Sequence, residues 1–203
     1  MTTPLTPEAI AQNPDGVTET ITFACGERIT FRLLRPEDAE LLGRYFLRLS
    51  EETRRRFGPH PFTMEQAQKL CAEINYYDTL RLIAVTEKGG QPQVIAYFIL
   101  QLGIKEAEKK RYQAHGMVLD ECKDCTFAPS VADAYQNRGL GSTLMPKILD
   151  LARRFGFQRM VLMGGTQATN YRAIHFYEKF GFRKVGDFLT KGGVNNHDMI
   201  LAL

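Results

Sequence analysis

The segment that decides the fold is Val131-Ala132-Asp133-Ala134-Tyr135-Gln136-Asn137-Arg138-Gly139-Leu140-Gly141-Ser142. It joins a short apolar stretch over residues 125–132 to a stretch with helical periodicity over residues 141–155. Glycines let backbone amides approach a ligand closely, and the start of a helix adds unpaired N–H groups and a positive dipole end. Because Arg138 adds positive charge at the same place, the segment indicates a site for an anion such as a diphosphate.

Two other anion-binding loops are excluded by the residues present. A Walker loop needs Gly-Lys-Ser/Thr, whereas Gly141 is followed directly by Ser142-Thr143. A dinucleotide fingerprint needs G-x-G-x-x-G in an early βαβ unit, and this chain has none there. Taken alone, the segment could still be an ordinary strand-to-helix turn that uses two glycines.

The residues after this segment predict a strand, a helix and closing strands. Met160 to Met163 reads as a buried strand, and 170–180 reads as a helix stopped by Gly181 before Phe182. Strands are expected over 184–189 and 198–203.

The residues before the segment predict two hairpins, at 20–33 around Cys25-Gly26 and at 80–102 around Gly89-Gly90. Helices are expected from Pro36 to Leu49, from Ser50 to Arg56 and over 63–74. Residues 103–115 are charged and read as a solvated loop or an irregular excursion. The fold class predicted is therefore α/β (α+β), with a mixed, mostly antiparallel central sheet flanked by helices.

Two prolines carry specific expectations within these elements. Pro129 interrupts a strand and indicates a bulge, an edge or a local splay, because proline cannot donate to a β-ladder. Pro146 should kink its helix unless it lies in the first turn.

Length and composition fit one domain. The 203 residues are 44% hydrophobic and 24% charged, as in ordinary globular proteins. We expect a single domain over 17–203, preceded by a flexible arm over 1–16 that is rich in Thr, Pro, Asn and Asp.

Charge and hydropathy argue against several classes of partner. A net charge of +3 with interspersed signs does not favour nucleic acid. No apolar run approaches the ~20 residues of a membrane span, and no secretory signal is evident, so a cytoplasmic protein is expected. Cys122 and Cys125 form a C-x-x-C, but no second ligand pair exists, so we expect incidental thiols and no metal.

A second segment, Asn170-Tyr171-Arg172-Ala173-Ile174-His175-Phe176-Tyr177-Glu178-Lys179-Phe180-Gly181-Phe182, completes a resemblance. With the Q-x-x-G-x-G of Gln136 to Gly141, its N-x-x-A-x-x-x-Y-x-x-x-G-F pattern resembles the GNAT superfamily of acyl-CoA N-acyltransferases in residues, order and separation. A looser resemblance runs from Ile29 to Leu203. The run 49–57 is less specifically similar to the bacterial protein lysine acetyltransferases.

The resemblance implies a GNAT-type fold and acetyl-CoA as the acyl donor. Backbone amides of the loop would hold the coenzyme A pyrophosphate; these residues are Gln136, Asn137, Arg138, Gly139, Leu140, Gly141 and Ser142. Backbone groups of Ser130, Val131 and Asp133 would pair with the pantetheine arm like an added strand. Asn170 would hydrogen-bond the cofactor, and the small side chain of Ala173 would leave room for it.

The resemblance also assigns Tyr177 as the general acid that protonates the departing thiolate. A phenol suits this role, since the two pKa values lie within about two units of each other (~10 and ~8.5). Many relatives carry a glutamate base on the strand before the loop, but Thr126 holds that position here and cannot act as a base. Glu121, Asp124 and His115 are further candidates, each of which is more typical of a solvated surface charge.

The function implied is acetyl transfer from acetyl-CoA to a primary amine by direct attack. The acceptor could be a small-molecule amine, a protein lysine or a protein N-terminus. The alternatives are a non-catalytic acyl-CoA sensor, suggested by Thr126 and Pro129, and a different nucleotide-binding module. Arg54, Arg55 and Arg56 could bind an acidic acceptor, but charge runs usually form an exposed face. Because many members of the superfamily pair through sheet edges or C-terminal strands, a homodimer is compatible with the resemblance.

Overall fold

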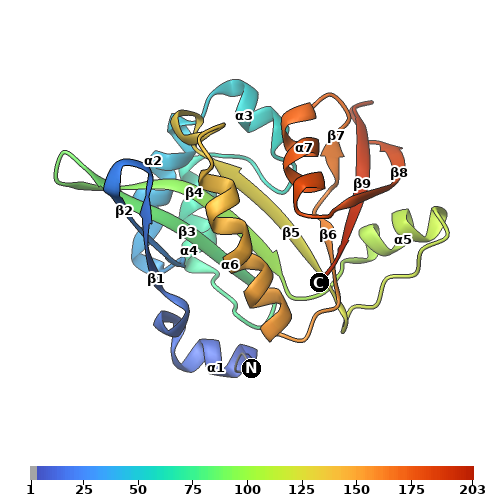
Figure 1. Ribbon diagram of the computed structural model, residues 1–203, viewed down its shortest axis with the longest axis horizontal. Coiled ribbons are helices and arrows are strands. Elements are labelled where there is room, and N and C mark those ends of the chain that lie inside the picture. The colour runs from blue at the N-terminus through green and yellow to red at the C-terminus, as the bar shows by residue number, and fades with distance from the viewer. Residues whose placement is uncertain (1–3) are drawn as a thin grey trace.

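A computed structural model describes residues 4–203, which form one nine-stranded sheet with helices on both faces (Figure 1). The strand order is β1-β2-β3-β4-β5-β6-β9-β7, and β8 pairs with β9. Every neighbouring pair is antiparallel except β5 and β6, which are parallel. The predicted fold class, a mixed and mostly antiparallel sheet flanked by helices, is confirmed. The strands are β1 (Glu19–Phe23), β2 (Glu27–Leu33), β3 (Thr79–Lys88), β4 (Gln91–Gln101), β5 (Asp124–Val131), β6 (Arg159–Leu162), β7 (Thr166–Gln167), β8 (Arg183–Leu189) and β9 (Asn195–Ala202).

Each predicted hairpin turns at residues with a positive φ, Cys25 and Gly26 in the first and Gly89 and Gly90 in the second. Cys25 and Gly26 adopt φ values of 58° and 80° between β1 and β2. Along β2, every second side chain is buried, as expected for a strand with one face on the core: Ile29, Phe31 and Leu33.

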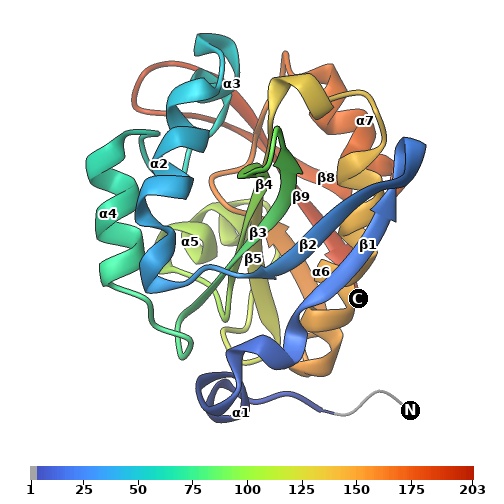
Figure 2. The same ribbon diagram turned by 90° about the vertical axis from the view of Figure 1, so that its left-hand side faces the viewer.

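Two hydrophobic layers cover the sheet. Figure 2 shows α2 (Ala39–Arg48) and α4 (Met64–Ala72) on one side, and α6 (Leu140–Arg154) and α7 (Tyr171–Lys179) on the other. Helix α6 buries an apolar stripe against its face of the sheet, and it continues through Pro146 without a break. The opposite layer is rich in aromatic rings from α2, β4 and the segment before α4.

The solvated loop predicted over 103–115 is wrong. Residues Glu106–Ala114 form helix α5, which lies beside β8 and β9 (Figure 1). The hydroxyl of Tyr112 is buried and donates to the carbonyl of Met199 at 2.7 Å, and Arg111 pairs with the buried Asp198 at 3.1 Å. The buried residues of α5 itself are Glu108 and Tyr112, so the segment lacks the apolar periodicity that identifies a helix.

The N-terminal region also differs from the expected arm. Within it, α1 (Pro7–Gln12) starts at Thr6, whose side chain caps the helix, and Ile10 is buried in the core. The amide of Leu5 donates to the carbonyl of Arg154 at the end of α6. Residues 1–3 of the expected arm lie outside the described residues. None of the helices in residues 4–203 has the length and apolar character needed to cross a membrane.

Candidate active site

A slot opens in the sheet where its single parallel pair comes apart. Strands β5 and β6 pair only from Asp124 opposite Arg159 to Phe127 opposite Leu162. Beyond Phe127, β5 continues to Val131 with β4 as its partner, and no strand from residues 4–203 pairs with its other edge. The splay suggested by Pro129 is therefore present, while the β4–β5 register stays unbroken through Pro129. The slot leaves one strand edge free to hydrogen-bond a bound molecule.

The anion loop lies at the end of β5, at the start of α6. Asn137 and Gly139 have positive φ values of 58° and 87°, and Gly139 caps the helix in the left-handed conformation. The first helical bond runs from the Thr143 amide to the Gly139 carbonyl, so three preceding amides find no acceptor within residues 4–203. These amides, from Leu140, Gly141 and Ser142, form the type of site that binds phosphate oxygens.

Gly141 is the glycine of this loop at which an added side chain would be crowded. A Cβ there would lie 3.3 Å from the Phe176 ring of α7 and 3.9 Å from the Val131 side chain. The glycine therefore allows α6, α7 and the end of β5 to approach closely around the slot.

Alternation along β5 decides which backbone groups face the slot. The Ala132 amide donates to the Ile95 carbonyl on β4, and the Phe127 carbonyl accepts from Met163 on the β6 side. Hydrogen-bonding direction alternates along a strand, so Ser130 is bonded to β4 and Val131 faces the slot. The Val131 carbonyl accepts from the Gln136 side chain at 2.8 Å, leaving its amide as the donor on this edge.

Most of the residues expected at the site line one pocket of about 440 Å³, within the usual range for ligand sites. Its lining includes Ser130, Val131, Gln136, Asn137, Gly139, Leu140, Gly141, Ser142, Asn170, Ala173 and Tyr177. Two residues of the expected set, Asp133 and Arg138, do not line it. Arg138 lies over the Tyr135 ring, and Asp133 turns toward α3 (Glu51–Arg56).

Tyr177 lies on the buried side of α7. It is 7% exposed, and within residues 4–203 its hydroxyl has no hydrogen-bond partner. Burial raises the pKa of Tyr177, so the phenol keeps its proton throughout the neutral range. An unpaired, protonated phenol on a pocket wall is available to donate to a ligand.

Asn170 begins α7 and has two partners. Its Oδ1 accepts from the Ala173 amide at 3.3 Å, which caps the helix, and from Arg56 Nη1 at 2.8 Å. Arg56 also pairs with Glu52 at 2.8 Å. Asn170 thus connects α7 to α3, a contact that the sequence pattern does not reveal.

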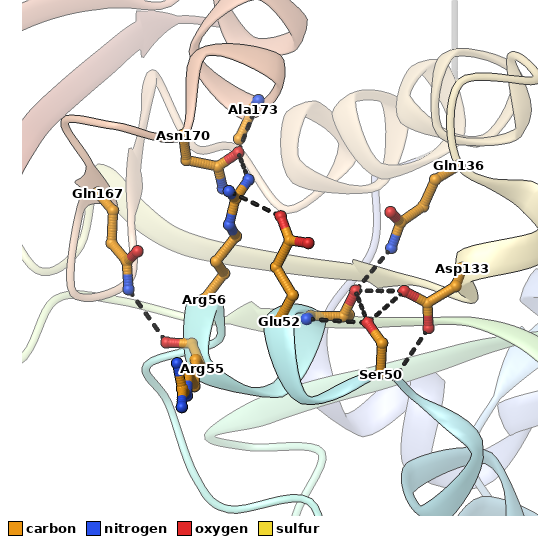
Figure 3. Close-up of polar contacts among 10 residues, drawn as sticks. Ser50, Glu52, Arg55, Arg56, Asp133, Gln136, Gln167, Asn170 and Ala173 are labelled. Carbon is orange, nitrogen blue, oxygen red and sulfur yellow. Dashed lines mark hydrogen bonds and ion pairs between the residues drawn. The ribbon is translucent and has the colours of Figure 1, made fainter.

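Helix α3 makes polar contacts with residues on both sides of the slot (Figure 3). On one side, Asp133 accepts from the hydroxyls of Ser50 and Thr53 at 2.6 Å each, and Gln136 donates to Thr53 at 3.1 Å. On the other side, besides the Arg56–Asn170 bond, Gln167 donates to the Arg55 carbonyl at 3.0 Å. Burial alone would raise the pKa of Asp133, but the bonds from Ser50 and Thr53 outweigh it and lower that pKa.

Two neighbouring arginines of α3, Arg55 and Arg56, point in different directions. Arg55 is 76% exposed and pairs with Glu51, as expected for a solvated face. Arg56 is 28% exposed and lines the pocket. The other basic residues of the lining are Arg172, His175 and Lys179 on α7, and in the described chain no Asp or Glu lines it. The pocket therefore suits an anionic ligand.

None of the residues considered as a base reaches the slot as a free proton acceptor. The Thr126 hydroxyl is buried and donates to the Gly103 carbonyl at 2.9 Å. Asp124 is buried in a pair with Arg159 at 2.6 Å, and Glu121 pairs with Lys109 at 2.6 Å on the surface. His115 packs against the backbone of Gly186 in β8. Of the C-x-x-C thiols, Cys125 is buried and Cys122 is exposed.

The family model described as Acetyltransferase (GNAT) family matches residues 52–182. An acetyltransferase of Pseudomonas aeruginosa is 30% identical over 137 residues, which cover 66% of this chain. The chain spans 65% of the length of that relative.

Solved structures show the same fold at low sequence identity. The GNAT domain of S. lividans PAT has a TM-score of 0.71 and 20% identity, covering 94% of this chain and 99% of that one. The ribosomal-protein-S5-alanine acetyltransferase of Vibrio fischeri has a TM-score of 0.67 and 14% identity, covering 91% and 96%. The yncA protein of Salmonella typhimurium, solved with its cofactor acetyl-CoA, has a TM-score of 0.58 and 20% identity, covering 86% and 94%.

Proposed function

The chain belongs to the acetyltransferase (GNAT) family, and from that premise we propose that it transfers an acetyl group from acetyl-CoA to a primary amine by direct attack, with Tyr177 as the general acid. The acceptor is a small-molecule amine, a protein lysine or a protein N-terminus. One observation carries the proposal: an unpaired, buried phenol and a set of unpaired helix-start amides line the same slot beside a free strand edge.

The residues fit coenzyme A. The amides of Leu140, Gly141 and Ser142 would hold the diphosphate, with basic side chains of α7 nearby. The Val131 amide would bond the pantetheine arm. Bound acetyl-CoA supplies an activated acyl carbon and a thiolate leaving group.

Tyr177 would donate its hydroxyl proton to the departing sulfur. Burial raises the pKa of this phenol, and the same low-polarity surroundings raise the pKa of the thiol that forms, so proton transfer between them remains accessible. The proton that the new amide nitrogen must lose can restore the phenol, which balances the step.

A Tyr177→Phe variant tests this assignment. We expect turnover to fall by about 10²-fold or more, the usual contribution of a general acid, with affinity for coenzyme A within about two-fold of wild type. Tyr171→Phe, on the same helix but 76% exposed, is the matched control. Undiminished turnover of Tyr177→Phe in stopped-flow assays would remove the phenol from the mechanism.

A non-catalytic acyl-CoA sensor is the second candidate. Many relatives carry a glutamate that acts as a general base at this position, whereas the Thr126 hydroxyl donates to the Gly103 carbonyl. Acetyl-CoA consumption should be measured against pooled small amines, lysine peptides and N-terminal peptides, with calorimetry of acetyl-CoA binding run in parallel. Tight binding with no transfer to any acceptor would favour the sensor.

A further inference from the structure

Acetyl transfer needs a hydrogen-bond donor at the acyl oxygen as well as a proton for the leaving sulfur, and this inference rests on the proposed function. When the amine attacks, the thioester carbonyl oxygen gains negative charge, and donors that face this oxygen lower the barrier. The proposed role of Tyr177 is at the sulfur. The acyl oxygen therefore requires a second donor on the pocket wall.

The free edge of β5 has no amide donor where the acyl end of the cofactor would lie. Val131 and Pro129 face the slot, because Ser130 between them is bonded to β4 and hydrogen-bonding direction alternates along a strand. With the diphosphate held in the loop that follows Val131, the acyl end would lie toward Pro129 and Phe127. Pro129 is about 7 Å further along the strand than Val131 and has no N–H. Since Phe127 is already paired with β6, the edge offers a donor at Val131 and none beyond it.

The side chain of Ser130 lies next to this gap, on the face of β5 that α2 covers. Ala128, the next residue of β5 on that face, belongs to the aromatic layer that contains α2. Ser130 and Ala128 line the pocket together with Phe57, Gly58 and Pro59, which follow α3. Ser130 is thus a polar residue in an otherwise apolar part of the pocket wall.

The partner of Ser130 decides where its hydroxyl hydrogen points. Tyr45 on α2 lies behind Ser130, with the two hydroxyl oxygens 2.8 Å apart. Tyr45 is fully buried, and within residues 4–203 its hydroxyl has no other hydrogen-bond partner. Burial raises the pKa of Tyr45, so the phenol keeps its proton. Because a buried hydroxyl without an acceptor is destabilising, Tyr45 donates to Ser130 Oγ, and the hydrogen of Ser130 is left for the pocket.

The neighbouring polar side chains on this side of the slot are already engaged. Thr53 donates to Asp133 at 2.6 Å, and the Gln136 amide donates to Thr53 at 3.1 Å and to the Val131 carbonyl at 2.8 Å. Among the described residues, the Ser130 hydroxyl has no acceptor of its own. The bond that it receives from the phenol also polarises it, since hydrogen bonds in a chain strengthen one another.

We propose that Ser130 is a further catalytic residue, whose hydroxyl donates to the acyl oxygen of acetyl-CoA and replaces the main-chain donor that Pro129 lacks. The amine nitrogen bonds to the acyl carbon, and the carbonyl π pair moves onto the oxygen that faces Ser130. When the carbonyl re-forms, the carbon–sulfur bond breaks and the sulfur takes the proton of Tyr177. The nitrogen then releases its extra proton, which restores the phenol. Ser130 keeps its own proton throughout.

A Ser130→Ala variant tests the proposal. We expect kcat to fall by about 10²-fold, as is usual when one donor to an oxyanion is removed, with affinity for coenzyme A within about two-fold of wild type because coenzyme A has no acyl oxygen. Ser130→Thr keeps a hydroxyl and should recover most of the loss. Thr126→Val is the matched control, since it removes a buried hydroxyl from the same face of β5 that donates to Gly103 and does not line the pocket.

A Tyr45→Phe variant tests the direction of the bond between the two hydroxyls. Tyr45 is a positioning residue, and without its donor the Ser130 hydroxyl is free to turn, so we expect a loss in kcat of about tenfold. The double variant Tyr45→Phe, Ser130→Ala should be no slower than Ser130→Ala, because Tyr45 acts only through Ser130. Tyr112→Phe, which removes an equally buried phenol bonded to Met199, is the control. A double variant much slower than Ser130→Ala would contradict this coupling.

Isotope-edited infrared spectra report on the acyl oxygen without turnover. In the complex of wild type with acetyl-CoA labelled with ¹³C at the carbonyl, measured without an acceptor, the C=O band should lie at lower frequency than in free acetyl-CoA. The hydrogen bond from Ser130 weakens the C=O bond, so Ser130→Ala should move the band back toward the free value and Thr126→Val should not. A band at the same frequency in wild type and Ser130→Ala would overturn the proposal, as would an unchanged kcat.

These measurements separate the role of Ser130 from the proposed function. If wild type bound acetyl-CoA and acetylated no amine, the proposed function would fail, and the infrared band alone would still decide whether Ser130 donates to the acyl oxygen. If wild type acetylated an amine and Ser130→Ala did so equally fast, only the role of Ser130 would be rejected.

Discussion

The two walls of the slot are built in different ways. The phosphate wall is one continuous segment, 136–142, and its binding groups are backbone amides held by the start of α6. The opposite wall is α3 and the residues after it, fixed by side chains to Asp133, Gln136, Gln167 and Asn170 (Figure 3). In the described chain α3 buries no residue of its own, so polar contacts alone attach it. A backbone-built wall tolerates many side-chain changes, whereas a wall built from side chains depends on each partner.

The largest effect is expected when a side chain is added to the phosphate wall. In Gly141→Leu, the added atoms must displace Phe176, since even a Cβ would lie 3.3 Å from its ring. We expect coenzyme A affinity to fall by about 10²-fold, or about 2.7 kcal/mol, in isothermal titration calorimetry. Gly192→Ala, whose Cβ would meet only the Thr190 hydroxyl at 3.9 Å, should bind as wild type does. Unchanged affinity in Gly141→Leu would contradict the close packing described.

A smaller effect is expected where α3 meets the loop. Asp133→Ala removes the acceptor for the hydroxyls of Ser50 and Thr53 and for the Ser50 amide. The kcat/KM for the acceptor should fall by about tenfold because charge-assisted bonds of this kind contribute 1.5–3 kcal/mol before solvent screening. Coenzyme A affinity should hardly change. An equal loss in both quantities would mean that the walls are not independent.

The same carboxylate gives this attachment a pH dependence. The pKa of Asp133 is lowered in the folded chain by the Ser50 and Thr53 bonds, against the opposing effect of burial. Its contribution to stability is therefore complete above the unfolded value of about 3.9 and is lost as the pH falls through the folded pKa. The difference in melting temperature between wild type and Asp133→Asn should be present at pH 7 and vanish in stronger acid. A difference that grows on acidification would contradict the sign.

The smallest effect tests the other end of α3. Arg56→Lys keeps a charge near Glu52 but loses the forked geometry that also reaches Asn170. We expect a rise of about threefold in the KM for the acceptor, corresponding to the ~0.6 kcal/mol typical of a partly exposed contact. Arg55→Lys, on the exposed face, is the control. Identical kinetics in Arg56→Lys and wild type would show that the Asn170 contact has no role in acceptor binding.

The contrast also explains what the sequence could predict. The hairpins, most of the strands and helices, and the loop at 136–142 were readable because periodicity, turn residues and glycines act locally. The partners of α3 could not be predicted, because Arg56 and Asn170 are 114 positions apart and no sequence pattern links the two. Helix α5 was missed because Glu108, Arg111 and Tyr112 bury polar groups in specific bonds, which no hydropathy pattern records.

His60 is another residue whose surroundings cannot be predicted from the sequence. In the sequence it lies between Pro59 and Pro61 and has no motif. Its environment comes from β4 and α2, which fold over it from other parts of the chain. By contrast, the presence of Thr126 at the position where many relatives carry a glutamate was visible in the sequence, and the expectation that a base comes from elsewhere remains a prediction.

Pro129 has a consequence for the behaviour of this protein in a crowded solution. An unpaired strand edge ordinarily recruits strands from other chains and seeds aggregation. On this edge Pro129 has no N–H to offer, and the Val131 carbonyl is already occupied by Gln136. A strand from another chain could therefore not form a continuous hydrogen-bond ladder along this edge, whereas a short ligand needs only the Val131 amide. The proline that weakens the strand acts as a gatekeeper against misassembly.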